Sequence, residues 1–440
     1  MKTGAGVGAA ATARRYRRRA APGKRARFTA ASLDSATPRR YPAAVTIDDV
    51  IAGKRVVVAV GSGGVGKTTA AAAIGLRAAA HGRKVVVCTV DPARRLANSM
   101  GLDAMGHEAV RVDPERLAAA GLANTGELWA LMLDAQRTLE DLVRRHSASP
   151  EMRERLLQNR LFRTLVERMA GTREYMSMEK LWEIDHDGRY DLIVLDTPPT
   201  ASAVDFLEAP ERMISAWDSP AVEWFLAPFR KAGTFSFRVL SFSTSFVLKQ
   251  LARFVGTTMI EDIATFLLDL NQLFDGFQNR AREVERLLKS DRVAFVLVTG
   301  ADMHTLSEAA YLRERLAGAR VRLEAYVVNR LNPRFDARGG TATSAATPAS
   351  APELAERLRA LGGAALADLP PDTPDALAEA MARNLEQTDV LASVDRERVE
   401  ALRRDAGDTP VFAVPQLETD VHDLAALGRL ATFLGERVSY

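Results

Sequence analysis

A glycine-rich segment between a β-branched run and an alanine-rich run constrains the fold of this chain more than any other feature. Residues 56–69 read V-V-V-A-V-G-S-G-G-V-G-K-T-T and contain the pattern G-x-x-x-x-G-K-[ST]. Glycines permit backbone conformations that side chains forbid, so consecutive N–H groups can point at phosphate oxygens where a helix begins. The segment therefore predicts a phosphate-binding loop between a strand and a helix. Its predicted nucleotide-binding residues are Gly61, Ser62, Gly63, Gly64, Val65, Gly66, Lys67, Thr68 and Thr69.

Two side chains of this loop and one distant carboxylate form the predicted phosphate and metal site. We expect Lys67, a predicted catalytic residue, to reach the β- and γ-phosphates of ATP, and the Thr68 hydroxyl to bind Mg²⁺. The segment D-L-I-V-L-D at 191–196 is an apolar run that ends in Asp196. Such a position is the carboxyl edge of a strand, where open α/β sheets bind ligands. The predicted cofactors are therefore ATP and Mg²⁺, with Thr68 and Asp196 on the metal.

Asp91 is the second predicted catalytic residue. It lies in T-V-D-P-A-R-R-L at 89–96, directly after another β-branched run. We expect its carboxylate to orient or deprotonate the attacking water. An Asp-Pro turn, in which the carboxylate accepts local backbone hydrogen bonds, is the alternative.

Six short apolar runs predict buried parallel strands. They are Val56–Val60, Val85–Val90, Leu192–Leu195, Val293–Val298, Ala325–Val328 and Val411–Val414. Helical patterns separate them, and the first helix is expected to end near Ala80, before Gly82. This alternation predicts an α/β fold: a doubly wound, mostly parallel sheet of the P-loop NTPase class with an inserted α-helical subdomain.

The domain organisation follows from composition along the chain. Residues 46–440 are expected to form the P-loop domain, with helical insertions that lack strands at about 104–190 and about 205–290. A segment at 337–352, poor in charge and rich in Gly, Thr, Ser, Ala and Pro, predicts a flexible linker. Residues 1–45 predict a disordered basic extension, since residues 1–40 hold eleven Lys and Arg against one acid. An organelle transit peptide and a wrongly chosen start codon are the alternatives.

The three motifs together resemble those of the anion-transporting ATPase family, which includes arsenite-pump ATPases and the ATPases for guided entry of tail-anchored membrane proteins. The matching segments are G-S-G-G-V-G-K-T, D-P-A-R and D-T-P-P-T, with a similar helical segment at 171–181. The likeness covers about residues 50–435 and is nearest to the actinobacterial branch. It implies that Asn329 reads the adenine and that Pro415 lies beside the base. It also implies ATP hydrolysis by a dimeric nucleotide switch that handles a hydrophobic or membrane-protein client.

The chain departs from the family pattern at the loop and in its cysteine content. Ser62 stands where the family has a lysine that reaches the partner's phosphates across a dimer, so turnover of the chain alone is expected to be slow. We expect the cation to come from a paralogous partner in a heterodimer, or from Arg94 or Arg95 of this chain. A homodimer is the alternative assembly. The single cysteine, Cys88, cannot build the paired zinc clamp or the thiolate cluster that arsenite requires.

The second insertion is unusually aromatic, because eleven of the seventeen Phe residues lie between Phe206 and Phe277. One apolar stripe at helical spacing comprises Ile260, Ile263, Phe266, Leu267, Leu270, Phe274 and Phe277. Burial of this stripe against other helices and the sheet is the first interpretation. The alternative is a groove for an apolar helix or lipid chain, in which Phe242 and Phe246 take part.

Two other functions stay open. A partition- or positioning-type ATPase needs a basic DNA-binding face or a membrane-binding C-terminal helix, and residues 423–437 hold two cations. The second alternative function is that of a nucleotide-sensing scaffold with little turnover. No specific nucleic-acid partner is expected. The expected location is the cytoplasm, with peripheral attachment at the membrane as an alternative.

Overall fold

The computed structural model describes residues 44–90, 94–102, 105–120, 126–159, 162, 172–197, 220, 256–334, 350–367, 370, 373–436 and 438–439. The chain divides into two units, residues 1–40 and 41–440, and every described residue belongs to the second. The predicted basic extension at 1–45 therefore lies outside the described residues up to position 43. Its last two residues, Ala44–Val45, form strand β1 and so belong to the folded unit.

An eight-stranded sheet organises the second unit, in the order β4-β5-β3-β6-β2-β7-β8-β9. All neighbouring strands pair in parallel except β4 and β5, which are antiparallel. The strands are β2 (Val56–Gly61), β3 (Lys84–Thr89), β4 (Val110–Arg111), β5 (Glu127–Met132), β6 (Leu192–Asp196), β7 (Val293–Thr299), β8 (Leu323–Leu331) and β9 (Val411–Pro415). A separate antiparallel pair joins β1 to β10 (Val438–Ser439).

Both faces of the central sheet are buried, as the continuous apolar runs predict. Along β2, Val56, Val58 and Val60 contribute to one hydrophobic core, whereas Val57 and Ala59 contribute to another. This alternation follows from the two-residue repeat of a strand, which sends successive side chains to opposite faces. Two cores on the two faces of a parallel sheet confirm the doubly wound α/β fold.

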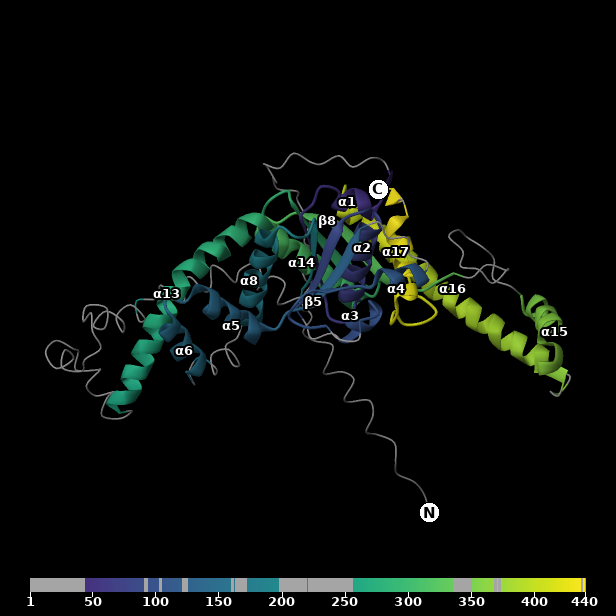
Figure 1. The fold of residues 1–440 in the computed structure, drawn as a ribbon. Helices are drawn as coiled ribbons and strands as arrows, with labels where there is room; N and C mark the ends of the chain where they lie inside the picture. Colours follow the sequence, from purple (N-terminus) through teal and green to yellow (C-terminus); the bar gives the residue numbers. More distant parts are fainter. Residues whose placement is uncertain are drawn as a thin grey trace, which may run out of the picture. The chain divides into compact units, whose positions relative to one another are not determined.

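The helices divide between the two faces. The core on one face receives residues from α1 (Ile47–Ile51), α2 (Lys67–Ala80), α3 (Arg94–Ser99), α4 (Pro114–Ala119) and α17 (Leu424–Gly435). The other receives residues from α5 (Ala135–His146), α6 (Pro150–Gln158), α8 (Thr172–Asp187), α13 (Thr257–Leu288), α14 (Met303–Gly318) and α16 (Thr373–Ala406). Figure 1 shows α2 and α17 side by side. None of the described helices is both long and apolar enough to cross a bilayer.

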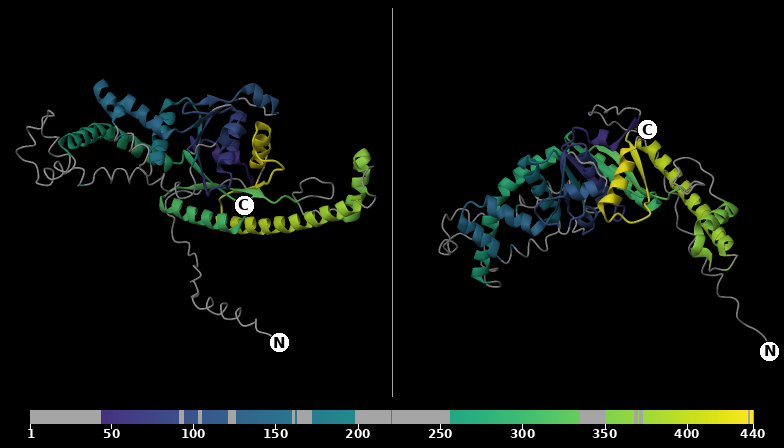
Figure 2. Two further views of the ribbon diagram at one scale, coloured as in Figure 1. Left: turned by 90° about the horizontal axis from the view of Figure 1, so that it is seen from below. Right: turned by 45° about the vertical axis from the view of Figure 1, so that its right-hand side comes forward.

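A helical hairpin of α15 (Ala351–Ala367) and α16 follows the parallel strands β7 and β8 (Figure 2). It has a small core of its own, built around Leu354, Ala355 and Ala378. Because α15 begins at Ala351, the predicted flexible linker at 337–352 is wrong for its last two residues. Residues 337–349 of that linker lie outside the described residues.

All six predicted strands are present, but the prediction of an entirely helical segment at 104–190 is wrong. Strands β4 and β5 lie within it, and β5 pairs with β3 over its whole length. The β5 sequence E-L-W-A-L-M consists largely of good helix formers, so its intrinsic propensity favours a helix. Pairing with β3 overrides that propensity, since strand formation depends chiefly on neighbours.

The second insertion is helical where the structure describes it. α13 spans Thr257–Leu288, and residues 205–255 lie outside the described part except at position 220. Phe266, Leu270 and Phe277 of the predicted stripe are buried in the core shared with α5, α6 and α8. This burial supports the interpretation of the stripe as core. Phe242 and Phe246, which the groove interpretation needs, are outside the described residues.

Candidate functional site

The predicted phosphate loop joins β2 to α2 at the carboxyl edge of the sheet. Gly61 has φ of 153°, and a β-carbon there would collide with the carbonyl oxygen of Val298 on the neighbouring strand β7. Gly66, the N-cap of α2, is left-handed with φ of 92°, and a β-carbon there would collide with the amide of Asn329. Glycine is therefore required at position 61 because a β-carbon would meet backbone, and at position 66 because of its left-handed conformation.

Two polar side chains of the loop are buried within it. The Lys67 amine donates a hydrogen bond to the carbonyl oxygen of Ser62 at 2.7 Å. The Ser62 hydroxyl is also buried and makes no hydrogen bond to any residue that the structure describes. A buried hydroxyl without a protein partner normally meets a ligand or water, because burying it alone costs free energy. Both groups fit a loop that receives an anion.

The predicted metal ligands come together across 128 residues of sequence. The Thr68 hydroxyl, in the first turn of α2, donates to Asp196 Oδ2 at 2.6 Å. Thr89, at the end of β3, donates its hydroxyl to the same oxygen at 2.9 Å. The parallel pairing of β3, β6 and β2 brings the three together, since all three strands end at the same edge. A carboxylate and a hydroxyl at this spacing are hard oxygen donors that suit Mg²⁺.

The thiol beside this edge has no reactive character. Burial raises the pKa of Cys88 to about 12, the negative charge of Asp196 adds to that rise, and Lys180 of α8 opposes it. The thiolate is the nucleophilic form, so Cys88 remains a neutral thiol at neutral pH. Cys88 packs as a small buried hydrophobe in the core of one sheet face.

A cavity of about 680 Å³ opens beside the phosphate loop. Gly66 and Thr69 line it from the loop side, Asn329 from the end of β8 and Pro415 from the end of β9. Its size is in the range of small-molecule sites. The structure therefore places Asn329 and Pro415 together on one wall next to the phosphate loop, although 86 positions separate them in the sequence.

Some predicted residues lie outside what the structure describes. Asp91 is one of them, and the side chains of Arg94 and Arg95 in α3 are others. Their predicted roles therefore stay predictions.

Thr89 and Arg330 are candidate site residues that the motifs did not single out. Thr89 stands two positions before the D-P pair, and that spacing is the only sequence signal for it.

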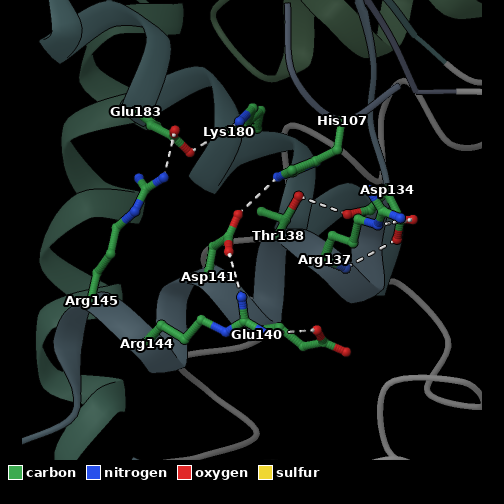
Figure 3. Close-up of polar contacts among 10 residues, drawn as sticks. All are labelled: His107, Asp134, Arg137, Thr138, Glu140, Asp141, Arg144, Arg145, Lys180 and Glu183. Carbon is green, nitrogen blue, oxygen red and sulfur yellow. Dashed lines mark hydrogen bonds and ion pairs between the residues drawn. The ribbon is translucent and has the colours of Figure 1, made fainter. Parts of the chain in front are cut away.

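A network of charged side chains lies between α5, α8 and the segment before β4 (Figure 3). His107 points from that segment toward α5, where its Nε2 lies 3.1 Å from Asp141 Oδ2. On α8, Glu183 contacts Arg145 at 3.0 Å and Lys180 at 3.3 Å. Burial, and after it the charge of Lys180, lowers the pKa of His107, while Asp141 opposes the shift. His107 is therefore a buried, neutral imidazole at neutral pH.

Acidification is expected to destabilise the protein through His107. Its pKa is lower in the folded than in the unfolded chain, so the unfolded chain binds the proton first and stability falls as pH drops below about 6.5. One proton gives a slope of at most about 1.4 kcal/mol per pH unit. We expect His107→Gln to remove this part of the slope between pH 7.5 and 5.5 in urea unfolding.

Carboxylates of ordinary pKa are ionised in both proteins over this pH range, so the difference between the two slopes reports the histidine. His146 is the control, since burial also lowers its pKa and Arg280 and Arg145 add to the effect. His146→Gln should reduce the slope independently of His107→Gln. Identical slopes for wild type and His107→Gln would contradict the assignment.

The chain is similar to proteins of a known ATPase family. The model of the family described as anion-transporting ATPase matches residues 54–342. The chain is 26% identical over 288 residues to the putative arsenical pump-driving ATPase 1 of Aquifex aeolicus, a match covering 63% of this chain and 64% of that protein. It is 30% identical over 151 residues to the ATPase get3 of Aspergillus terreus, covering 34% of this chain and 41% of that protein.

A further similar protein is the ATPase GET3 of Malassezia globosa, 24% identical over 272 residues, with 62% of this chain and 71% of that protein covered. The match to the Aquifex and Aspergillus proteins thus spans less than two thirds of their length. The family match includes the phosphate loop, Thr89, Asp196 and Asn329, and ends before the α15–α16 hairpin. On the sheet topology, the loop geometry and this match, the chain belongs to the anion-transporting ATPase family.

Proposed function

We propose that this chain is a Mg²⁺-dependent ATP hydrolase that acts as a dimeric nucleotide switch for a hydrophobic or membrane-protein client. The observation that carries the enzymatic part is the convergence of Thr68 and Asp196, 2.6 Å apart, next to the buried amine of Lys67. Membership of an ATPase family and the names of the similar proteins support ATP as the substrate. Turnover is proposed to be slow for the chain alone, because Ser62 adds no cation to the loop.

Each residue has a defined part in this proposal. Loop amides and the N-terminus of α2 bind the phosphates, and Lys67 stabilises the negative charge that develops during transfer. Thr68 and Asp196 would hold Mg²⁺, which neutralises charge on the β- and γ-phosphates when it is bound. Asp91 is proposed to orient the attacking water. Asn329 and Pro415 are proposed to contact the base, in keeping with their place on the wall of the cavity beside the loop.

The switch and its client rest on relatives and on position in the chain. Two similar proteins are named ATPase GET3, and the family resemblance associates that name with tail-anchored membrane proteins. The proposed assembly is a homodimer, or a heterodimer with a paralogous ATPase that supplies the missing cation. The client would contact residues 205–255, since Phe266, Leu270 and Phe277 of the α13 stripe are already buried. The proposed location is the cytoplasm, with peripheral contact at the membrane.

The proposal is tested by measuring binding, assembly and client retention on the full chain. Calorimetry should show Mg·ATP binding that weakens when Mg²⁺ is chelated. Sedimentation should show a larger species with a non-hydrolysable ATP analogue than with ADP, and that species should retain a hydrophobic helical peptide. No heat of binding would refute the enzymatic part. Binding without a change in assembly or peptide retention would refute the switch alone.

Thr89→Val is expected to slow ATP hydrolysis about tenfold and to weaken the apparent affinity for Mg²⁺. The Thr89 hydroxyl is fully buried and donates to the oxygen of Asp196 that also accepts from Thr68. Its loss removes one of the hydrogen bonds that orient the carboxylate, and a hydrogen bond to a charged group is worth about 1.5–3 kcal/mol. The measurement is a Mg²⁺ titration of the hydrolysis rate. Thr89→Ser, which keeps the hydroxyl, should retain the wild-type Mg²⁺ dependence, and equal curves for all three proteins would refute the role.

A further inference from the structure

The phosphate loop is held from outside by two consecutive residues at the end of β8. Asn329 donates its side-chain amide to the carbonyl oxygen of Val65 at 2.9 Å. Arg330 donates its Nη1 to the carbonyl oxygen of Gly64, also at 2.9 Å. Two neighbouring side chains of one strand thus bind two neighbouring carbonyls of the loop.

The backbone at Arg330 takes an unfavourable conformation to make this contact. Its φ is +62°, and among the described residues Arg320 is the other non-glycine residue with a positive φ. The pairing register of β8 with β9 shifts between Val328 and Leu331, which places Arg330 inside the irregularity. A left-handed backbone conformation at a residue with a long side chain costs free energy, and it persists where the surrounding structure requires it. Arg330 therefore makes its contact with the loop from within this irregular stretch of β8.

The two hydrogen bonds act on the peptide groups that present N–H donors to a ligand. The carbonyl of Gly64 belongs to the same peptide unit as the N–H of Val65, and the carbonyl of Val65 belongs with the N–H of Gly66. The C=O and N–H of a trans peptide point in opposite directions, so anchoring the carbonyls outside orients the N–H groups toward the inside of the loop. A cationic donor on a carbonyl also polarises its peptide unit and strengthens the N–H on the other side.

We propose that Arg330 is a positioning residue for phosphate binding: together with Asn329 it forms an outer clamp that orients and polarises the loop amides. The clamp rests on the proposed nucleotide function. It adds a second positive charge to that of Lys67, and this charge acts on the phosphates through the polarised peptide groups of the loop. The part of Arg330 in the clamp concerns the phosphates and not the base, although Arg330 also borders the cavity next to the loop.

The test compares Arg330→Gly with Arg320→Gly in the full chain. Both substitutions relieve a left-handed arginine, but Arg320 is an exposed residue in the turn after α14 and lies outside the loop contacts. We expect Arg330→Gly to weaken Mg·ATP binding about tenfold, the loss of one partly exposed charge-assisted hydrogen bond. Arg320→Gly should bind as the wild type does. Arg330→Lys, which keeps a cationic donor, should recover most of the affinity.

Mg·tripolyphosphate, which has no base, separates the clamp from a role in base recognition. The clamp requires that Arg330→Gly weaken binding of tripolyphosphate and of ATP by the same factor in calorimetry. Weaker ATP binding with unchanged tripolyphosphate binding would overturn the clamp and assign Arg330 to the base. Equal affinity of Arg330→Gly and wild type would overturn it as well. If the wild-type chain binds neither probe, the proposed function itself fails, a result distinct from both.

Discussion

ATP hydrolysis by Lys67→Ala is expected to be about 10³-fold slower than hydrolysis by the wild-type chain. The Lys67 amine is buried in the phosphate loop and is held at 2.7 Å from the carbonyl of Ser62, at the N-terminus of α2. A fixed charge in a partly desolvated site stabilises the developing negative charge far better than one in water. Loss of one such group costs about 10²–10³ in rate, and single cations in phosphoryl transfer supply about 10³–10⁵. The measurement is steady-state release of phosphate.

The effect on binding should accompany the effect on rate, because Ser62 offers no second cation within the loop. Calorimetry of Lys67→Ala should therefore show greatly weakened Mg·ATP binding. Lys289→Ala is the matched control, since Lys289 is an exposed lysine that pairs with Glu285 within the last turn of α13. It should hydrolyse ATP at the wild-type rate. If Lys67→Ala binds and hydrolyses ATP as the control does, the site is not where the loop lies.

Lys54→Met is expected to lower the free energy of unfolding by about 3–5 kcal/mol. Lys54, just before β2, is almost fully buried, and its amine lies 2.9 Å from Glu324 Oε1 on β8. The same amine donates to the backbone carbonyls of Asp291 at 2.8 Å and Val293 at 3.3 Å. The substitution removes the closest cation, while Arg322 stays with its Nε 3.7 Å from the same carboxylate oxygen. A buried charge that is poorly compensated is among the costliest defects in a protein interior. Urea unfolding monitored by circular dichroism measures the change.

Two controls identify the cause of that loss. Arg383→Ala breaks an ion pair with Glu379 in which both side chains are 66% exposed, and it should change stability by less than about 0.5 kcal/mol. The double variant Lys54→Met/Glu324→Leu should recover much of the loss, because apolar residues of similar volume replace both charges of a buried pair at little cost. A Lys54→Met protein as stable as Arg383→Ala would contradict the buried-pair assignment.

Local patterns were sufficient for the centre of the candidate site. Gly61, Lys67 and Thr68 lie within one short segment, and the strand before it and the helix after it define their directions. Asp196 is distant in sequence but ends an apolar run, and the carboxyl ends of parallel strands share one edge. The contact between Thr68 and Asp196 could therefore be predicted from general rules of α/β folds.

Other parts of the protein could not be read from local sequence. Strand β5 has the residues of a helix, and its pairing with β3 decides its conformation. Thr89 is an ordinary strand residue until the neighbouring strand β6 brings Asp196 to its hydroxyl. The left-handed conformation of Arg330 depends on a register shift between β8 and β9, and strand register is a property of the pair.

The sequence by itself determined the chemistry of this protein: a glycine loop, a lysine, a hydroxyl and a carboxylate, each where strand and helix periodicity places it at the edge of a sheet. Tertiary structure alone decided which side chains support that chemistry, among them Thr89 on the carboxylate and Arg330 on the carbonyl of Gly64. The physical reason is that loop geometry arises from residues next to one another, whereas supporting contacts join strands whose pairing and register are set by the whole sheet.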